Sequence, residues 1–190
     1  MSDPRSDVLA YLSPGSIGAE VGVHLGDFSA LILETVRPSL LHLIDPWLYR
    51  HESQYVAAWY GGIATGQSEM DLRHESVCDR FVGQIRDGQV VVHRAASGDM
   101  LGKLPDASLD WIYIDGDHLY DKVRADLSLS FRKVRAGGLV IGDDYGVEGW
   151  WKNGVTKAVD EVLRESPVSL LDVQANQYVI RVLDANGAEQ

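Results

Sequence analysis

The sequence predicts an α/β domain built on a mostly parallel sheet, with helices on both faces. Two observations support this fold class. Short runs rich in Val, Ile and Leu alternate with longer stretches whose apolar residues recur at helical spacing. No internal repeat or low-complexity segment interrupts the alternation, and 190 residues suit a single domain over 1–190. Such alternation is typical of a parallel sheet covered by helices.

Seven runs have the length and composition of strands. In chain order they are 17–23, 40–45, 90–93, 109–115, 138–144, 168–173 and 177–183. The last two follow each other closely, so we expect them to pair as a hairpin. Helical spacing of apolar residues predicts four helices between or beside these strands. They are 29–36, 68–86, 119–134 and 154–165, with Ser29 near the start of the first and Asn153 as the N-cap of the last.

Residues 46–67 form the one long connection without a clear period, and they carry five aromatic side chains followed by glycines. Long connections in compact domains are often functional, which favours a lid over a site. A helical insertion packed on the edge of the domain explains the same composition, and an aromatic surface could also serve a homodimer contact. The aromatic residues are Trp47, Tyr49, Tyr55, Trp59 and Tyr60.

The overall charge limits the choice of partner. The net charge of −11 argues against nucleic acid or an anionic membrane as the main partner. A single cysteine, Cys78, allows no internal disulfide and fits a reducing cytoplasm. The polar start of the chain lacks the apolar core of a secretory signal, and no apolar run reaches the roughly 18 residues of a membrane span. We therefore expect a cytoplasmic protein that acts on a small molecule.

The segment EVGVHLGDFS, residues 20–29, joins the first strand to the first helix. Gly22 and Gly26 allow a tight turn, and the helix that follows offers free N–H groups to a ligand. The glycines are spaced G-x-x-x-G, so the dinucleotide fingerprint G-x-G-x-x-G is absent. A turn required only for packing would have the same sequence.

Two carboxylates near the glycine turn indicate what kind of ligand this turn would bind. Asp45 ends the second strand, at a distance from the glycine turn where an acid can accept both ribose hydroxyls. Glu20 lies inside an apolar strand, where an unpaired carboxylate is costly, and this suggests a cationic partner such as an ammonium group. Together the turn and the two acids fit a nucleoside that carries an amino-acid tail.

EVGVHLGDFS, followed by LIDPW at 43–47, resembles the first two motifs of the class I S-adenosylmethionine-dependent methyltransferases. HRAASGDML at 93–101 resembles the segment that frames the adenine in that family. The resemblance covers about residues 15–165. It implies S-adenosylmethionine as cofactor and a Rossmann-like seven-stranded sheet whose last strand is antiparallel.

The resemblance also implies a set of cofactor-binding residues. Glu20 is expected to contact the methionine ammonium group and Asp45 the ribose, while Trp47 and Ser97 would frame the adenine. The full set is Glu20, Gly22, Val23, His24, Gly26, Ser29, Asp45, Pro46, Trp47, Ala96, Ser97 and Asp115.

Carboxylates follow two further strands, in IDGDH at 114–118 and GDDY at 142–145. Ligands of open α/β sheets bind at the carboxyl ends of the strands. Asp115, Asp143 and Asp144 would meet there and repel one another unless a cation offsets their charge. Oxygen ligands suit Mg²⁺. The alternative is a cluster that is protonated or paired with Lys or Arg.

These two motifs resemble the metal-binding positions of the divalent-metal-dependent O-methyltransferases of the catechol and macrolide-sugar types. That resemblance implies Asp115, Asp143 and Asp144 as Mg²⁺ ligands, with Asp115 also catalytic. It implies His118 as the general base, because the sugar type has a histidine at this position. The alternative for His118 is a hydrogen bond to Asp117 or a cap on the helix that follows.

The sequence thus predicts an S-adenosylmethionine-dependent, Mg²⁺-assisted O-methyltransferase acting on a sugar or another natural product. The candidates for the walls of an acceptor pocket are the 46–67 segment and the aromatic residues Tyr145, Trp150 and Trp151. Three alternatives stay open: a metal-independent N- or O-methyltransferase, a nicotinamide-dependent oxidoreductase, and a binding domain without catalysis.

Overall fold

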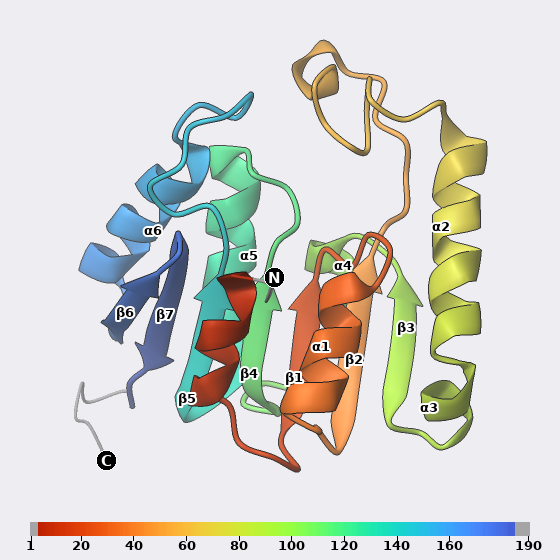
Figure 1. Cartoon of the computed structure of the whole chain (residues 1–190). Coiled ribbons are helices and arrows are strands. Elements are labelled where there is room, and N and C mark those ends of the chain that lie inside the picture. Colours follow the sequence, from red (N-terminus) through yellow and green to blue (C-terminus); the bar gives the residue numbers. More distant parts are fainter. Residues whose placement is uncertain (1–3, 185–190) are drawn as a thin grey trace.

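A computed structural model describes residues 4–184, which form one seven-stranded sheet with helices on both faces (Figure 1). The strand order is β3-β2-β1-β4-β5-β7-β6. The strands are β1 (Ile17–Val21), β2 (Leu40–Asp45), β3 (Val90–Arg94), β4 (Leu109–Ile114), β5 (Val134–Gly142), β6 (Val168–Gln174) and β7 (Gln177–Val182). Strands β1 to β5 pair in parallel, whereas β7 is antiparallel to both β5 and β6. The predicted fold class is confirmed.

The helices match the predicted ones with three differences. They are η1 (Pro4–Tyr11), α1 (Asp27–Thr35), η2 (Ser53–Tyr55), α2 (Gln67–Arg80), α3 (Val82–Arg86), α4 (Ser97–Leu101), α5 (Tyr120–Lys133) and α6 (Gly154–Glu165). The predicted helix 68–86 is divided at Phe81, whose backbone leaves helical geometry. The sequence analysis missed three short helices, which are η1, η2 and α4. Asn153 holds the N-cap position of α6, but its side chain makes no capping hydrogen bond.

Two hydrophobic cores lie on opposite faces of the sheet. One face packs against η1, α1 and α2, with residues such as Leu9, Ile32 and Met70 fully buried. The other face packs against α4, α5 and α6, through residues such as Leu127 and Val159. Because both faces are covered, the central strands are apolar on both sides. Their continuous apolar runs are the reason why the sequence predicts them correctly.

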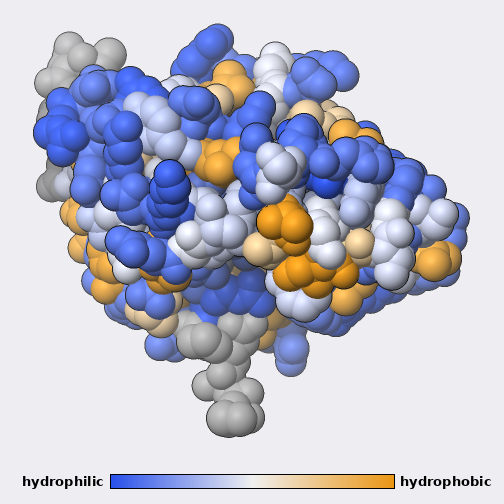
Figure 2. Space-filling view, turned by 90° about the horizontal axis from the view of Figure 1, so that it is seen from above, coloured by the Kyte–Doolittle hydropathy of each residue, from blue (hydrophilic) through white to orange (hydrophobic). Residues whose placement is uncertain are grey.

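The carboxyl ends of β1 to β5 lie at the upper edge of the sheet in Figure 1. Two segments stand above this edge: residues 46–66, which connect β2 to α2, and the loop between β5 and α6. Figure 2 looks down on this edge, where hydrophilic residues predominate and hydrophobic ones form small patches among them. Within residues 4–184, no helix has both the length and the apolar character needed to cross a membrane.

Candidate functional site

The turn after β1 is held by Asp45, the last residue of β2. Its carboxylate oxygen Oδ2 accepts hydrogen bonds from the backbone N–H groups of Val23 (2.8 Å) and His24 (3.1 Å). Gly22 adopts φ +89°, and a Cβ there would lie 1.9 Å from the carbonyl oxygen of Asp115. The glycine therefore has a packing requirement of its own, because any side chain would push β1 away from the end of β4.

Asp45 is almost completely buried, with 1% of its surface exposed. Besides the two N–H groups of the turn, it accepts the backbone N–H of Trp47 (2.7 Å) and the hydroxyl of Tyr60 (2.5 Å). Burial raises the pKa of Asp45, and these hydrogen bonds act against that rise. The residue predicted to bind a ribose is thus in contact with a tyrosine of the 46–66 segment, a partner that no sequence pattern indicates.

Glu20 is equally buried in β1, and it accepts a hydrogen bond from the Ser29 hydroxyl at 2.5 Å. Burial raises the pKa of Glu20 to about 8, although the bond from Ser29 lowers it. The structure thus keeps a carboxyl group below the surface of the turn, with the Ser29 hydroxyl as a hydrogen-bond donor to it. An ammonium group placed beside it would favour the ionised form.

The other predicted cofactor residues are dispersed along this edge. Pro46 and Ala96 are exposed, and Gly26, with φ +76°, is the N-cap residue of α1. Trp47 is fully buried, and its indole N–H donates to the carbonyl oxygen of His24 (3.0 Å), so its ring belongs to the core here. Ser97 donates a hydrogen bond to Asp126 (2.6 Å), a buried acid of α5 that the sequence analysis did not single out.

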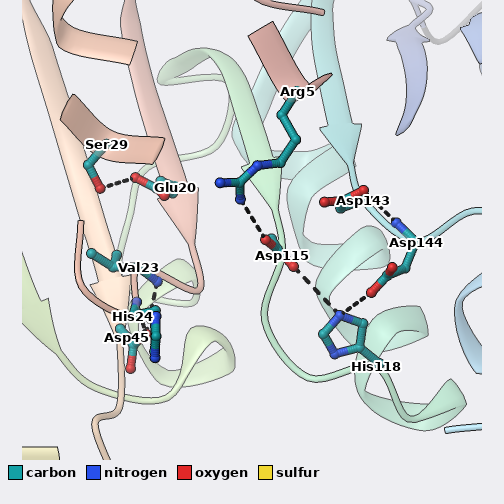
Figure 3. A network of polar contacts seen from close by, with 10 residues as sticks. All are labelled: Arg5, Glu20, Val23, His24, Ser29, Asp45, Asp115, His118, Asp143 and Asp144. Atoms are coloured by element: carbon teal, nitrogen blue, oxygen red, sulfur yellow. Dashed lines mark hydrogen bonds and ion pairs between the residues drawn. The ribbon is translucent and has the colours of Figure 1, made fainter. Parts of the chain in front are cut away.

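The second group of carboxylates lies at the ends of β4 and β5, as Figure 3 shows. The Nε2 atom of His118 is 2.7 Å from Asp144 Oδ2 and 3.6 Å from Asp115 Oδ1. One ligand atom from each of these three residues lies within 4.8 Å of the others. Asp143 is next to the group, and its Oδ1 accepts the backbone N–H of Asp144 at 2.9 Å. The structure thus brings together the two acidic motifs and the predicted base.

The charged groups of this cluster shift the pKa values of one another. Burial lowers the pKa of His118, but its bonds to Asp115 and Asp144 and their charges raise it to about 9. For Asp143, burial first and the charge of Asp115 second raise the pKa to about 6. A pKa raised to about 9 favours the protonated form of His118 near neutral pH, and the positive charge of this form offsets the two carboxylates.

Arg5 is the functional candidate that sequence reasoning missed. It comes from η1, and its Nη1 donates to Asp115 Oδ2 at 3.3 Å, while its guanidinium lies 4.6 Å from the ring centre of Phe28 (Figure 3). No sequence pattern signals this contact, because 110 residues separate the two partners. The acidic cluster thus has two cationic side chains as neighbours.

Aromatic side chains of two loops surround His118. The Tyr55 hydroxyl of η2 donates to Asp117 at 2.6 Å, and the Tyr55 ring lies 5.4 Å from that of Trp150. The Trp151 ring lies 4.5 Å from the His118 ring, and its indole nitrogen is buried without a partner among the described residues. The 46–66 segment therefore reaches both halves of the site, through Tyr60 to Asp45 and through Tyr55 to Asp117.

Residues 19–145 match a protein family described as a methyltransferase domain. The chain belongs to this family. The matched region begins one residue before Glu20 and ends one residue after Asp144, so it contains both carboxylate groups of the site. The resemblance to methyltransferases found in the sequence motifs is thereby confirmed, and the oxidoreductase alternative is removed.

Relatives of this methyltransferase domain are distant. The uncharacterized protein R132 of Acanthamoeba polyphaga mimivirus is 34% identical over 79 residues, or 42% of this chain. The match spans 32% of the length of that relative.

Solved structures share the fold at low identity. The O-methyltransferase NovP superposes with a TM-score of 0.67 at 20% identity, over 95% of this chain and 80% of NovP. TomG from Streptomyces achromogenes, an O-methyltransferase of tomaymycin synthesis solved with SAM, gives 0.65 at 17%, over 96% and 81%. The O-methyltransferase from Bacillus cereus, solved with SAH, gives 0.65 at 14%, over 97% and 82%. At these identities the likeness shows the methyltransferase fold.

Proposed function

We propose that this methyltransferase domain transfers a methyl group from S-adenosylmethionine to a hydroxyl group of a small molecule, with the help of a divalent metal ion. The observation that carries the proposal is the arrangement of the upper sheet edge. Buried carboxylates lie at the ends of β1 and β2, and a carboxylate–histidine cluster lies at the ends of β4 and β5. Ligands of open α/β sheets bind along this edge.

The half formed by β1 and β2 is proposed to hold the cofactor. Glu20 would contact the ammonium group of the methionine part, directly or through water, and Asp45 would accept the ribose hydroxyls. The family match over 19–145 supports this assignment, as do the SAM and SAH complexes solved for the structurally similar TomG and Bacillus cereus enzymes. Hydrogen bonds within the chain already hold both acids, because backbone N–H groups bind Asp45 and the Ser29 hydroxyl binds Glu20.

The half formed by β4 and β5 has a donor set that fits a divalent ion, because its carboxylate and imidazole atoms converge within 4.8 Å. Asp115 and Asp144 are the proposed carboxylate ligands, with Asp143 beside them as the third predicted acid. A bound divalent ion would supply Lewis acidity, which lowers the pKa of an adjacent hydroxyl group. The sequence analysis expected Mg²⁺ in this role.

The transfer itself is proposed to be a displacement at the methyl carbon. The acceptor hydroxyl gives its proton to solvent water, its oxygen forms the new O–C bond, and the S–C bond breaks. The products are a methyl ether and S-adenosylhomocysteine. The contribution of the protein is to align the oxygen with the methyl group and to exclude bulk water from the reacting atoms. Trp150 and Tyr55 are proposed to wall the acceptor side. The acidic surroundings disfavour an anionic acceptor and are compatible with a sugar or a phenol.

A second candidate function is methyl transfer without a metal. The specific observation in its favour is that Arg5 and His118 already offset the carboxylates of the cluster. In that mechanism His118 would first release its own proton when the acceptor binds, and it would then be the general base predicted from the sequence, accepting the hydroxyl proton of the acceptor.

Two measurements on the purified protein test the proposal. Calorimetric titration with S-adenosylmethionine should show a single saturable site, and its absence in folded protein would reject the cofactor assignment. Methyl transfer to a panel of sugars and phenols should then stop when a chelator is added and resume when a divalent ion is returned in excess. Activity that continues in chelator would establish the metal-independent alternative.

A further inference from the structure

We infer that Asp126, a buried acid of α5, makes the proposed cofactor site selective for a purine that carries an amino group at position 6. Asp126 acts through Ser97 as a positioning residue, because it fixes the direction of the Ser97 hydroxyl proton. The inference rests on the proposed binding of S-adenosylmethionine and on the predicted place of Ser97 beside the adenine. It adds the chemical group that this part of the site recognises.

Ser97 lies close to the proposed ribose site. It is the first residue of α4, and the backbone N–H of Ala95, two residues earlier, donates to the carbonyl oxygen of Asp45 at 3.1 Å. The loop that carries Ser97 is thus attached to the residue proposed to bind the ribose. Ser97 is partly exposed, and a Cβ at the neighbouring Gly98 would meet no atom within 4 Å beyond its chain neighbours and its own helix. A planar base attached to a ribose at Asp45 can therefore extend toward the Ser97 hydroxyl.

Asp126 determines where the proton of that hydroxyl points. The Ser97 hydroxyl donates to Asp126 Oδ1 at 2.6 Å, and only 4% of the Asp126 surface is exposed. Burial raises the pKa of Asp126 to about 6, although the bond from Ser97 lowers it, so the carboxyl group is mostly ionised at neutral pH. A carboxylate only accepts hydrogen bonds, and a hydroxyl has a single proton to donate. The Ser97 oxygen therefore presents only lone pairs to a ligand.

A hydroxyl oxygen that can only accept distinguishes two kinds of purine. The 6-amino group of adenine donates hydrogen bonds, whereas a 6-oxo group accepts them. The amino group would bond to the Ser97 oxygen, and the oxo group would place two acceptors against each other. A site built around a hydrogen bond rejects an analogue that lacks the matching group, because the polar groups of the site are then left unpaired.

A purely structural role is the alternative for the same hydrogen bond. The bond joins the start of α4 to the middle of α5, and it could serve only to hold these helices together. A buried ionised acid is a costly way to join two helices, since neutral side chains can form the same contact. The two roles also predict different results. A structural contact affects the binding of every cofactor analogue equally, whereas a fixed proton changes the choice between analogues.

The test compares calorimetric titrations with S-adenosylhomocysteine and S-inosylhomocysteine, which share the ribose and the amino-acid tail and differ at position 6 of the purine. The intact protein should bind the adenosyl compound at least about tenfold more tightly. Asp126→Asn should reduce this preference to less than about threefold, because an amide can donate to the Ser97 oxygen and so release its proton. Ser97→Ala should do the same, and the double variant should reduce the preference no further. Asp121→Asn, at an exposed acid of the same helix, is the control and should keep the full preference.

Each outcome has a distinct meaning. Equal affinity of the intact protein for both compounds, or a preference that Ser97→Ala retains, would overturn the inference and leave the cofactor assignment intact. A loss of affinity for both compounds in Asp126→Asn, with their ratio unchanged, would give the bond a structural role and overturn the inference as well. Ser97→Ala removes only a hydroxyl, so it decides the question if Asp126→Asn does not fold. Binding of neither compound to the intact protein would overturn the inference together with the proposed binding of S-adenosylmethionine.

Discussion

The two halves of the site differ in the burial and in the partners of their carboxylates. In the half formed by β1 and β2, Glu20 and Asp45 are buried, and their partners are hydroxyls and backbone N–H groups. In the half formed by β4 and β5, Asp115 and Asp144 are partly exposed, and their partners are the cationic side chains Arg5 and His118. The same residue type at the same sheet edge is thus placed in two different environments.

The difference shows how each half is prepared for a ligand. Hydrogen bonds from the backbone are part of the fold, so the shape of the first half is fixed before a ligand arrives. The carboxylates of the second half are offset by the charged side chains Arg5 and His118, and the proposed metal ion would take the place of those charges. The first half is therefore suited to the shape of the proposed cofactor, and the second half is suited to the positive charge of the proposed metal ion.

The largest effect is expected from Asp144→Asn, which removes a negative charge from the second half. Methyl transfer should fall by about 100-fold or more, since both proposed mechanisms need this group beside His118. The affinity for S-adenosylmethionine should stay within about twofold, and the free energy of unfolding should change by less than about 1 kcal/mol, because the group is partly exposed. Activity assays, calorimetry and thermal unfolding measure the three quantities.

Asp121→Asn, at an exposed acid in the first turn of α5, is the matched control and should change none of them. A variant of Asp144 that loses cofactor binding as strongly as methyl transfer would show that the two halves do not act separately.

An intermediate effect is expected from Glu20→Gln in the buried half. The pKa of Glu20 is raised to about 8 in the folded protein, above its value in the unfolded chain. The folded state therefore retains a proton that the unfolded state has lost, and stability falls as the pH rises from about 5 to 8. Glu20→Gln should remove this fall and be more stable than the intact protein at pH 8 by on the order of 2–4 kcal/mol.

Unfolding by denaturant at pH 4 and pH 8 measures this difference, which should be small at pH 4, where Glu20 is mostly protonated in both states. The same variant should bind S-adenosylmethionine about tenfold more weakly at pH 8, because it lacks the charge for the ammonium group. Parallel pH dependence in the two proteins would show that Glu20 does not titrate in this range.

The smallest effect is expected from Tyr60→Phe, which removes one of the donors to Asp45. Loss of this hydrogen bond should lower the free energy of unfolding by about 1 kcal/mol. It should also raise the affinity for S-adenosylmethionine by up to about fivefold, because a lone pair of Asp45 becomes available to the ribose hydroxyls. Calorimetry measures the affinity, with Tyr49→Phe as a control in the same segment. A lower affinity in Tyr60→Phe would mean that this hydroxyl contacts the ligand.

Most of the fold could be predicted, because parallel strands covered on both faces are apolar throughout and stand out in the sequence. The division of helix 68–86 at Phe81 could not be seen, since the apolar spacing continues across the break. The short η1 helix has no apolar period of its own. It is held by packing of Val8 and Leu9 on the sheet.

The amino-acid sequence is enough to predict which carboxylates reach the functional edge. Each of them lies near or just beyond the carboxyl end of a strand, and the topology rule for parallel sheets places these strand ends together. The partners of these carboxylates depend on the tertiary structure. Arg5 reaches Asp115 across 110 residues, and Tyr60 reaches Asp45 from a segment without regular structure. The direction of a side chain beyond the end of a strand depends on packing between distant segments, and no local pattern in the sequence records that packing.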